Sequence, residues 1–153
     1  MFDIFTNNIE KIYAPVSGKL IDMSEVNDVA FAKKALGDGV AIIPNENIIK
    51  APCDGILNMI FRTKHAFGIK ASNGMELLIH IGIDTVELNG NGFKCFKNVN
   101  QKVKKGDPII EFSPILLKDF DKTVIIAVSN HDEFEKINIG NNIDTNDTIM
   151  IKK

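Results

Sequence analysis

Residues 13–23 read YAPVSGKLIDM, and residues 50–60 read KAPCDGILNMI. Both stretches contain the pattern A-P-x-x-G, followed by an apolar run and a methionine. Proline fixes one backbone corner and glycine permits the next, so each stretch predicts a turn that leads into a strand. Residues 103–112, VKKGDPIIEF, add another glycine turn before a strand. Although the pattern also occurs in ordinary turns, its recurrence favours a duplicated structural unit.

Short segments rich in β-branched residues and bounded by Gly, Pro, Asn or Asp fill most of the chain. They lie at 18–23, 39–44, 47–52, 55–61, 66–72, 76–83, 108–112, 123–129 and 147–153. Frequent short strands of this kind predict an all-β fold, an antiparallel β-sandwich or barrel. One or two short helices are expected, at 28–37, which ends at a glycine suited to a helix C-terminus, and at 113–123.

The composition predicts one domain that does not bind nucleic acid. The chain has 153 residues, a formal net charge of −2 and a pI near 5.9, whereas nucleic-acid binding leaves a basic footprint. We expect a short N-terminal tail over residues 1–12 and a single domain over 13–153. The sequence shows no signal peptide or membrane-spanning run, and its two cysteines form no CxxC pair, so a cytoplasmic protein with reduced thiols is expected.

One histidine interrupts the apolar stretch GMELLIHIGIDTVEL, residues 74–88. Alternate residues of a strand face opposite sides, and the odd positions here are all apolar: Met75, Leu77, Ile79, Ile81 and Ile83. The odd face is therefore the expected core face, and His80 lies on the other. Gly82, two positions further on that second face, leaves room for the close approach of a backbone or a ligand.

A second histidine, His65, occurs in IFRTKHAFGI, residues 60–69. If this stretch is one continuous strand, Phe61, Thr63 and His65 share a face, and Thr63 is placed to hydrogen-bond one ring nitrogen of His65. An antiparallel pairing across the turn KASNG, residues 70–74, would bring His65 close to His80. Two unrelated surface histidines are the alternative. His131 lies in a polar turn and is expected to be a solvated surface residue.

Three chemistries use a pair of histidines. Zinc hydrolysis has little support because neither HExxH nor HxH is present. Serine or cysteine catalysis has even less support, because no recognisable nucleophile motif surrounds the candidate nucleophiles Ser72, Ser129, Cys53 and Cys95. A phosphoryl relay needs one imidazole as nucleophile and a second to steady the phosphoryl oxygens.

GMELLIHIGIDTVELNGNGF, residues 74–93, resembles the active-site signature of glucose-type enzyme IIA proteins of the bacterial phosphoenolpyruvate-dependent sugar phosphotransferase system. The resemblance continues in IYAPVSGKL, DVAFAKKALGDGVAIIP, APCDGIL, TKHAFGI, VKKGDPIIEF and VSNHDE, and it covers roughly residues 13 to 153 in order. It implies an antiparallel β-sandwich. The A-P-x-x-G repeat similarly resembles the duplicated half-motif of barrel–sandwich hybrid folds, which biotinyl and lipoyl carrier domains share.

The resemblance to enzyme IIA implies specific roles for the residues singled out above. His80 would accept a phosphoryl group from the carrier HPr on its ε-nitrogen, as tele-phosphohistidine, and pass it to the cysteine of a sugar-specific IIB domain. His65 would be the auxiliary histidine that stabilises the phosphoryl group, with Thr63 orienting it. The backbone carbonyl of Gly82 would orient His80.

The resemblance also implies an apolar docking depression with an acidic rim. Acidic residues at a rim would steer a cationic partner without repelling the phosphoryl group. The matching apolar positions are Ala30, Phe31, Leu36, Phe61, Leu78 and Val86, and the acidic ones are Asp28, Asp84 and Glu87. For Phe31, a core helix residue is the alternative.

The remaining expectations concern cofactors, membranes and other functions. No cofactor is required, although His65 and His80 could share a zinc ion in a partner complex. The segment MFDIFTNNIEK is too short for confident membrane attachment, so contact with the membrane is expected only through the permease partner. Regulatory targets are possible. The alternatives are a biotinyl- or lipoyl-like carrier, for which M-K-M and D-K-A are both absent, and a zinc-dependent hydrolase on a related β fold.

Overall fold

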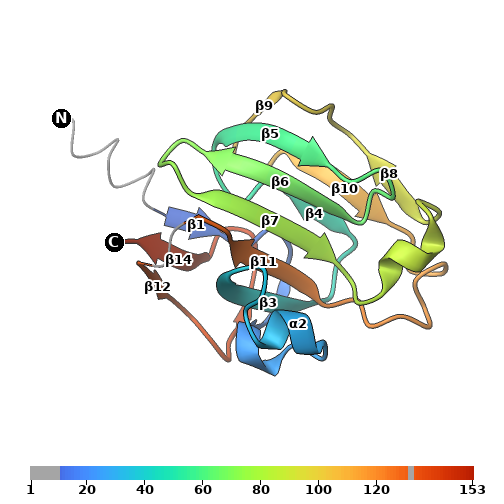
Figure 1. Ribbon diagram of the computed structural model, residues 1–153, viewed down its shortest axis with the longest axis horizontal. Coiled ribbons are helices and arrows are strands. Elements are labelled where there is room, and N and C mark those ends of the chain that lie inside the picture. Colours follow the sequence, from blue (N-terminus) through green and yellow to red (C-terminus); the bar gives the residue numbers. More distant parts are fainter. Residues whose placement is uncertain (1–10, 131–132) are drawn as a thin grey trace.

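The computed structural model describes residues 11–130 and 133–153, and its regular structure is almost entirely antiparallel β-strand (Figure 1). The strands are β1 (Lys11–Tyr13), β2 (Gly18–Asp22), β3 (Asp38–Pro44), β4 (Ile48–Lys50), β5 (Gly55–Ile60), β6 (Ala66–Ala71), β7 (Glu76–Ile81), β8 (Phe93–Cys95), β9 (Lys102–Val103), β10 (Pro108–Phe112), β11 (Val124–Val128), β12 (Phe134–Lys136), β13 (Asn142–Ile143) and β14 (Thr148–Lys152). The helical elements are the 3-10 helices η1 (Met23–Glu25) and η2 (Thr85–Leu88) and the α-helix α2 (Val29–Ala32).

The strands form one large sheet and two small ones. The large sheet has the order β13-β2-β3-β11-β7-β6-β5-β9, and the small sheets have the orders β4-β10-β8 and β1-β14-β12. This confirms the predicted all-β antiparallel sandwich. Each of the strands expected from the sequence is present; the unexpected ones, β1, β8, β9, β12 and β13, have two or three residues each and are too short for an alternating pattern to show.

The repeat seen in the sequence is a structural duplication. The backbone N–H of Tyr13 donates to the carbonyl of Pro52, and that of Lys50 donates to Pro15, both at 2.8 Å. The strand pairings of the two halves also correspond. Gly18 of β2 lies at the start of its pairing with β13, and Gly55 of β5 lies at the start of its pairing with β9. Reciprocal bonds of this kind relate the halves by a pseudo-twofold axis, which confirms the duplicated half-motif.

The helices are shorter than expected. In the first half, η1 and α2 lie between β2 and β3. In the second half, the equivalent strands β5 and β6 are joined only by the turn 61–65. The Asp28 carboxylate caps α2 by accepting from the N–H groups of Ala30 and Phe31. The segment 113–123 forms turns instead of a helix, because only Leu117 of its apolar run is buried while Ile115 and Leu116 are 77% and 52% exposed. A helix there would have no apolar face to bury.

The large sheet has an apolar cluster on each face. The main core includes Leu77, Ile79 and Ile81 of β7, and a smaller cluster beneath η1 and α2 includes Phe31, with Leu78 packed against it. Lys11 and Ile12, the last two residues of the expected tail, belong to β1, where Ile12 is fully buried and pairs with Met150 of β14. The rest of the expected N-terminal tail lies outside the described residues. Among those described, no helix is long and apolar enough to cross a membrane.

Candidate functional site

His80 lies on β7 with its side chain on the face opposite the main core. Burial alternates along this strand: Leu77, Ile79 and Ile81 are buried, while Leu78 and His80 are only partly buried. The predicted parity is therefore confirmed. The ring of Phe31 stands edge-on to the His80 ring at a centroid distance of 4.9 Å, so Phe31 shields one side of the imidazole from solvent.

His65 approaches His80 from the adjacent strand. β6 and β7 form an antiparallel hairpin in which Ala66 pairs with His80, and the Ile81 N–H donates to the His65 carbonyl at 2.7 Å. The two imidazole rings are nearly perpendicular, with centroids 4.8 Å apart. The expectation of a paired site is confirmed as geometry, and the alternative of two unrelated surface histidines is wrong, since His65 is only 3% exposed.

The segment before His65 is a turn, so the expectation of one continuous strand from Phe61 to His65 is wrong. β5 ends at Ile60, and Lys64 adopts a left-handed backbone conformation with a φ of 60°. The expected contact nevertheless forms, because the turn brings Thr63 Oγ1 within 2.7 Å of His65 Nδ1. Phe61 lies edge-on to the His65 ring at 5.3 Å. The tight turn, rather than strand parity, places these three side chains together.

A single hydrogen bond fixes which nitrogen of His80 is reactive. His80 Nδ1 lies 2.8 Å from the carbonyl oxygen of Gly82. A carbonyl can only accept, so Nδ1 carries the proton and Nε2 keeps its lone pair. The neutral ring therefore presents Nε2 as its nucleophilic atom.

The Gly82 carbonyl is itself held by the neighbouring strand and loop. Gly82 has a φ of 80°, and its N–H donates to the backbone carbonyl of Thr123. The next N–H, that of Ile83, donates to the backbone carbonyl of Asp121. The Asp121 carboxylate accepts from both the N–H and the hydroxyl of Thr123. Thr85, fully buried, donates its hydroxyl to the Ile81 carbonyl. Sequence reasoning did not single out these supports as site residues, because Asp121 and Thr123 lie in a loop far away in the chain.

Both histidines are held neutral near pH 7. Burial, and then the proximity of His65, lower the pKa of His80 to about 4, against the opposing effects of the Gly82 hydrogen bond and of Asp28 and Asp84. Burial also lowers the pKa of His65. A neutral imidazole is the form that acts as a nucleophile.

We predict a pH-dependent stability from this shift. Between pH 6.5 and about 4 the unfolded chain binds a proton at His80 that the folded chain does not bind, so the free energy of unfolding falls as the pH falls through this window. We expect a loss of about 1 to 2 kcal/mol, discounted for the partial exposure of His80. Denaturant unfolding at several pH values measures it.

The matched variant His80→Gln should reduce this pH dependence and leave the part that comes from the lowered pKa of His65. Asp22 and Asp38 titrate below this pH window. Burial alone would raise their pKa values, but hydrogen bonds from Lys136 hold both below the ordinary value of 3.8. An identical slope in the wild type and in His80→Gln would show that His80 does not cause it.

The residues expected to form a docking depression differ in their exposure to solvent. Leu36 and Val86 are 48% and 49% exposed, and Ala30, Asp84 and Glu87 are also exposed. Phe61, Leu78 and Asp28 are partly buried. Phe31 differs from the expectation, because it is 7% exposed and belongs to the small apolar cluster, where its ring supports His80.

Other catalytic centres find little support among the described residues. No group of three or more His, Cys, Asp or Glu side chains there could hold a metal ion. Burial raises the pKa of the Cys53 thiol to about 12 and also raises the pKa of Cys95, so neither is a ready thiolate.

Comparisons with known proteins show which family the chain resembles. Residues 10–134 match the family described as phosphoenolpyruvate-dependent sugar phosphotransferase system, EIIA 1. The chain is 46% identical over 129 residues to the PTS system glucose-specific EIIA component of Haemophilus influenzae, covering 83% of this chain and 78% of that protein. It is 44% identical over 137 residues to the component of the same name from Buchnera aphidicola subsp. Baizongia pistaciae, covering 88% and 82%. A structure titled glucose permease IIA from Mycoplasma capricolum superposes with a TM-score of 0.86 at 38% identity, covering 94% of this chain and 95% of that one.

Proposed function

This chain belongs to the EIIA 1 family of the phosphoenolpyruvate-dependent sugar phosphotransferase system, and on that premise we propose that it relays a phosphoryl group through Nε2 of His80. A phosphocarrier role in sugar uptake follows from the family. The donor, HPr, and the acceptor, the cysteine of a sugar-specific IIB domain, are part of the proposal. The observation that carries it is the hydrogen bond from His80 Nδ1 to Gly82, because it leaves Nε2 free beside a second neutral imidazole.

The relay consists of two displacements at phosphorus. The Nε2 lone pair of His80 attacks the phosphorus of phosphohistidine on HPr; the new N–P bond forms as the old one breaks, and the electron pair returns to the donor imidazole. In the second step the IIB thiolate attacks the same phosphorus, and Nε2 leaves with its electron pair. Nδ1 keeps its proton throughout, so the relay needs no external base. Such transfers depend mainly on positioning and electrostatic support.

His65 supplies that support in the proposed mechanism. When the Thr63 hydroxyl donates to Nδ1 of His65, the proton of the neutral ring is on Nε2. That N–H can donate to a phosphoryl oxygen on the neighbouring His80, whose ring is 4.8 Å away between centroids. Burial strengthens this hydrogen bond because little water competes for it.

The variant His65→Gln should slow onward transfer more than acceptance. The lost donor matters most when charge spreads over the phosphoryl oxygens as the group leaves His80, and one such donor contributes about 10²–10³ in rate. Rapid-quench measurement of the two half-reactions tests this. Wild-type rates in both would remove His65 from the mechanism, and Thr63→Val should show a weaker version of the same defect.

Charge reversal at the rim should slow the encounter with HPr. Asp84 is exposed and lies close to His80. Its charge partly opposes the lowering of the His80 pKa by burial. Asp84→Lys should lower the association rate by about tenfold at low salt and by less at high salt, because exposed charges are screened. Stopped-flow fluorescence measures the rate. The same change at Asp119, which is exposed outside the expected docking surface, serves as the control, and equal losses in both variants would contradict steering by Asp84.

Three further expectations remain predictions. A zinc ion shared by His65 and His80 would take its remaining ligands from a partner, since no cluster of three metal-binding side chains exists among the described residues. Regulatory targets and a cytoplasmic location are likewise untested. The carrier-lysine and zinc-hydrolase alternatives gain no support from the family match.

The proposed function is tested by reconstituting the relay. The protein is incubated with labelled phosphoenolpyruvate, enzyme I and HPr, and we expect one acid-labile, alkali-stable phosphate per chain, as phosphohistidine requires. Adding a IIB domain should discharge it. A chain that takes no label in the complete mixture, or that takes label without HPr, would contradict the proposal.

A further inference from the structure

A second surface feature lies at the end of β6 away from the histidines. Two adjoining hollows, of about 230 and 440 Å³, share Asp54, Ala71 and Ser72 in their walls. We call them together the lysine groove, because five lysines line it: Lys11, Lys70, Lys102, Lys104 and Lys105. Among the described residues, Asp54 is the only acidic side chain in the same lining, although the whole chain carries a net charge of −2.

One half of the lysine groove contains an ordered cross-strand row. Ile56 of β5 lies directly opposite Lys70 of β6 on one side and Lys102 of β9 on the other. Directly opposed residues share a face and stand about 5 Å apart, so an isoleucine is flanked by two ammonium-bearing side chains. Ile56 remains 41% exposed, and both lysines are exposed.

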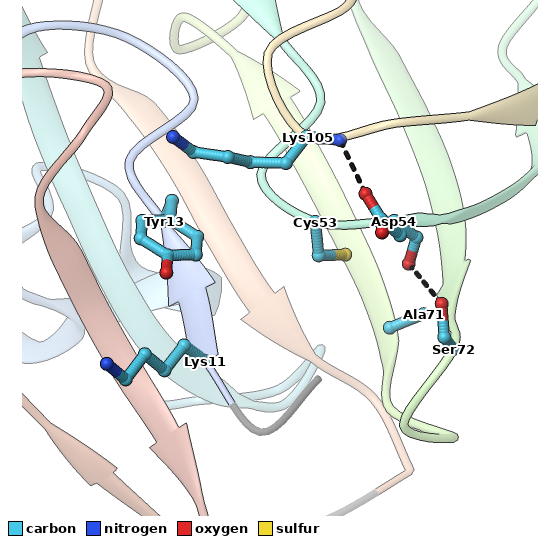
Figure 2. Close-up of a pocket in the computed structure, with 7 residues that line it drawn as sticks. All are labelled: Lys11, Tyr13, Cys53, Asp54, Ala71, Ser72 and Lys105. Carbon is cyan, nitrogen blue, oxygen red and sulfur yellow. Dashed lines mark hydrogen bonds between the residues drawn. The ribbon is translucent and has the colours of Figure 1, made fainter. Parts of the chain in front are cut away.

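The other half is a hollow with both polar and apolar walls, and hydrogen bonds connect parts of these walls (Figure 2). The Lys105 N–H donates to Asp54 Oδ1 at 2.9 Å, and the Ser72 hydroxyl donates to the Asp54 carbonyl at 3.0 Å. The Lys105 ammonium lies over the Tyr13 ring, 4.4 Å from its centroid. Cys53 contributes a buried and neutral thiol to the wall, because burial raises its pKa to about 12. Cys53 is therefore not a ready nucleophile in this hollow.

The five lysines of the groove form no ion pair in the part of the chain that the structure describes. Lysines on an edge strand also discourage sheet-to-sheet aggregation, and β9 is an edge strand. That explanation covers Lys102 and also Lys11 on the edge strand β1. It does not cover Lys70, which lies on an inner strand, or Lys104 and Lys105, which come from a loop.

The pseudo-twofold duplication provides an internal comparison. In the first half, the row equivalent to Lys70–Ile56–Lys102 is Ile43–Lys19–Asn142, on β3, β2 and β13. Its edge residue is Asn142, so this position of the fold does not require lysine. The paired lysines are a property of the second half alone.

We propose that the lysine groove docks an acidic polypeptide segment that carries an apolar side chain. Its carboxylates would contact Lys70, Lys102 and the lysines beyond them, while its apolar residue would cover Ile56. A membrane surface fits less well, because the lysines surround concave hollows rather than project from a convex face. The groove lies about 17 Å along β6 from the position paired with His80, so it can be occupied while the histidines remain free.

Titration of the full chain with a synthetic peptide of alternating glutamate and leucine, followed by ¹H–¹⁵N NMR, tests the proposal. We expect amide shifts at 54–56, 70–72 and 102–105, and weaker binding at higher salt. The double variant Lys70→Glu/Lys102→Glu should lose at least about tenfold in affinity. The control Lys19→Glu/Lys118→Glu has the same net charge and should bind as the wild type does. Ile56→Ser should remove the preference for this peptide over polyglutamate.

Three outcomes would overturn the proposal. Equal loss of affinity in the two double variants would show a response to net charge alone. Shifts that spread over the surface, or none at all, would show that the groove is not a site. Binding to phosphatidylserine vesicles that depends on Lys70 and Lys102, without peptide binding, would assign the groove to a membrane surface. Because peptide binding is measured without phosphoryl transfer, these results are independent of the proposed relay.

Discussion

Replacement of His80 by glutamine is expected to abolish phosphoryl acceptance, with a loss of at least about 10³-fold in the rate of labelling. A glutamine amide can donate to the Gly82 carbonyl as His80 Nδ1 does at 2.8 Å, and its volume is close enough to keep the contact with Phe31. It has no lone pair that can form an N–P bond. Acid-labile phosphate on the protein, measured with phosphoenolpyruvate, enzyme I and HPr, follows the reaction directly.

The control for this variant is His65→Gln, which loses the other imidazole of the pair but keeps Nε2 of His80. It should still accept the label while His80→Gln does not, although the two rings are only 4.8 Å apart between centroids. Thermal unfolding of both variants shows whether the fold is retained. Undiminished label on His80→Gln, at whatever site, would end the assignment of His80 as the acceptor.

The strand pattern predicted much of the fold and one half of the site. β7 alternates strictly, so the face of His80 followed from Leu77, Ile79 and Ile81 alone. The turn signals at Gly18 and Gly55 predicted the starts of β2 and β5, and these two strands form the equivalent pairings of the duplicated halves. These features are local, and a period of two residues is enough to show them.

The expected proximity of His65 to His80 is confirmed, but strand alternation does not explain it. Ala66 is the residue paired with His80, and His65 follows in register with Ile81, whose side chain lies on the core face. A regular strand would therefore direct His65 away from His80. The ring reaches the site because residue 65 precedes β6 and follows the left-handed residue Lys64. Alternation cannot predict a side chain that departs from the strand, and this contact depends on tertiary structure.

The supports of Gly82 were hidden for a different reason. Asp121 and Thr123 belong to a loop that was expected to end a helix, yet their carbonyls accept from Ile83 and Gly82. Nothing in the composition of that loop indicates which strand end it will meet. The strand β11 that follows it pairs with β7, and this long-range pairing decides the contact.

Substitution of Gly82 by alanine should damage both stability and activity. At a φ of 80°, a Cβ on residue 82 would stand 2.5 Å from Thr85 Cγ2 and 3.1 Å from the Asp121 carbonyl oxygen. The left-handed backbone costs about 1–2 kcal/mol for a residue with a side chain, and the overpacking costs about 1–3 kcal/mol more. Relief of the clash would shift the carbonyl that orients His80, and a displacement of about 1 Å can lower the rate about 10²-fold. Denaturant unfolding and the labelling rate measure the two effects.

Gly106→Ala is the matched control for this prediction. Gly106 has a similar left-handed φ of 94°, but no heavy atom lies within 4 Å of the position that its Cβ would occupy. It should therefore suffer only the backbone strain of about 1–2 kcal/mol and keep the wild-type rate of phosphoryl acceptance. In Gly82→Ala, NMR should also show His80 exchanging between its two tautomers, because Nδ1 would no longer be held by the carbonyl. If both glycine variants lost stability equally and both kept the wild-type rate, the Gly82 carbonyl would have no part in orienting His80.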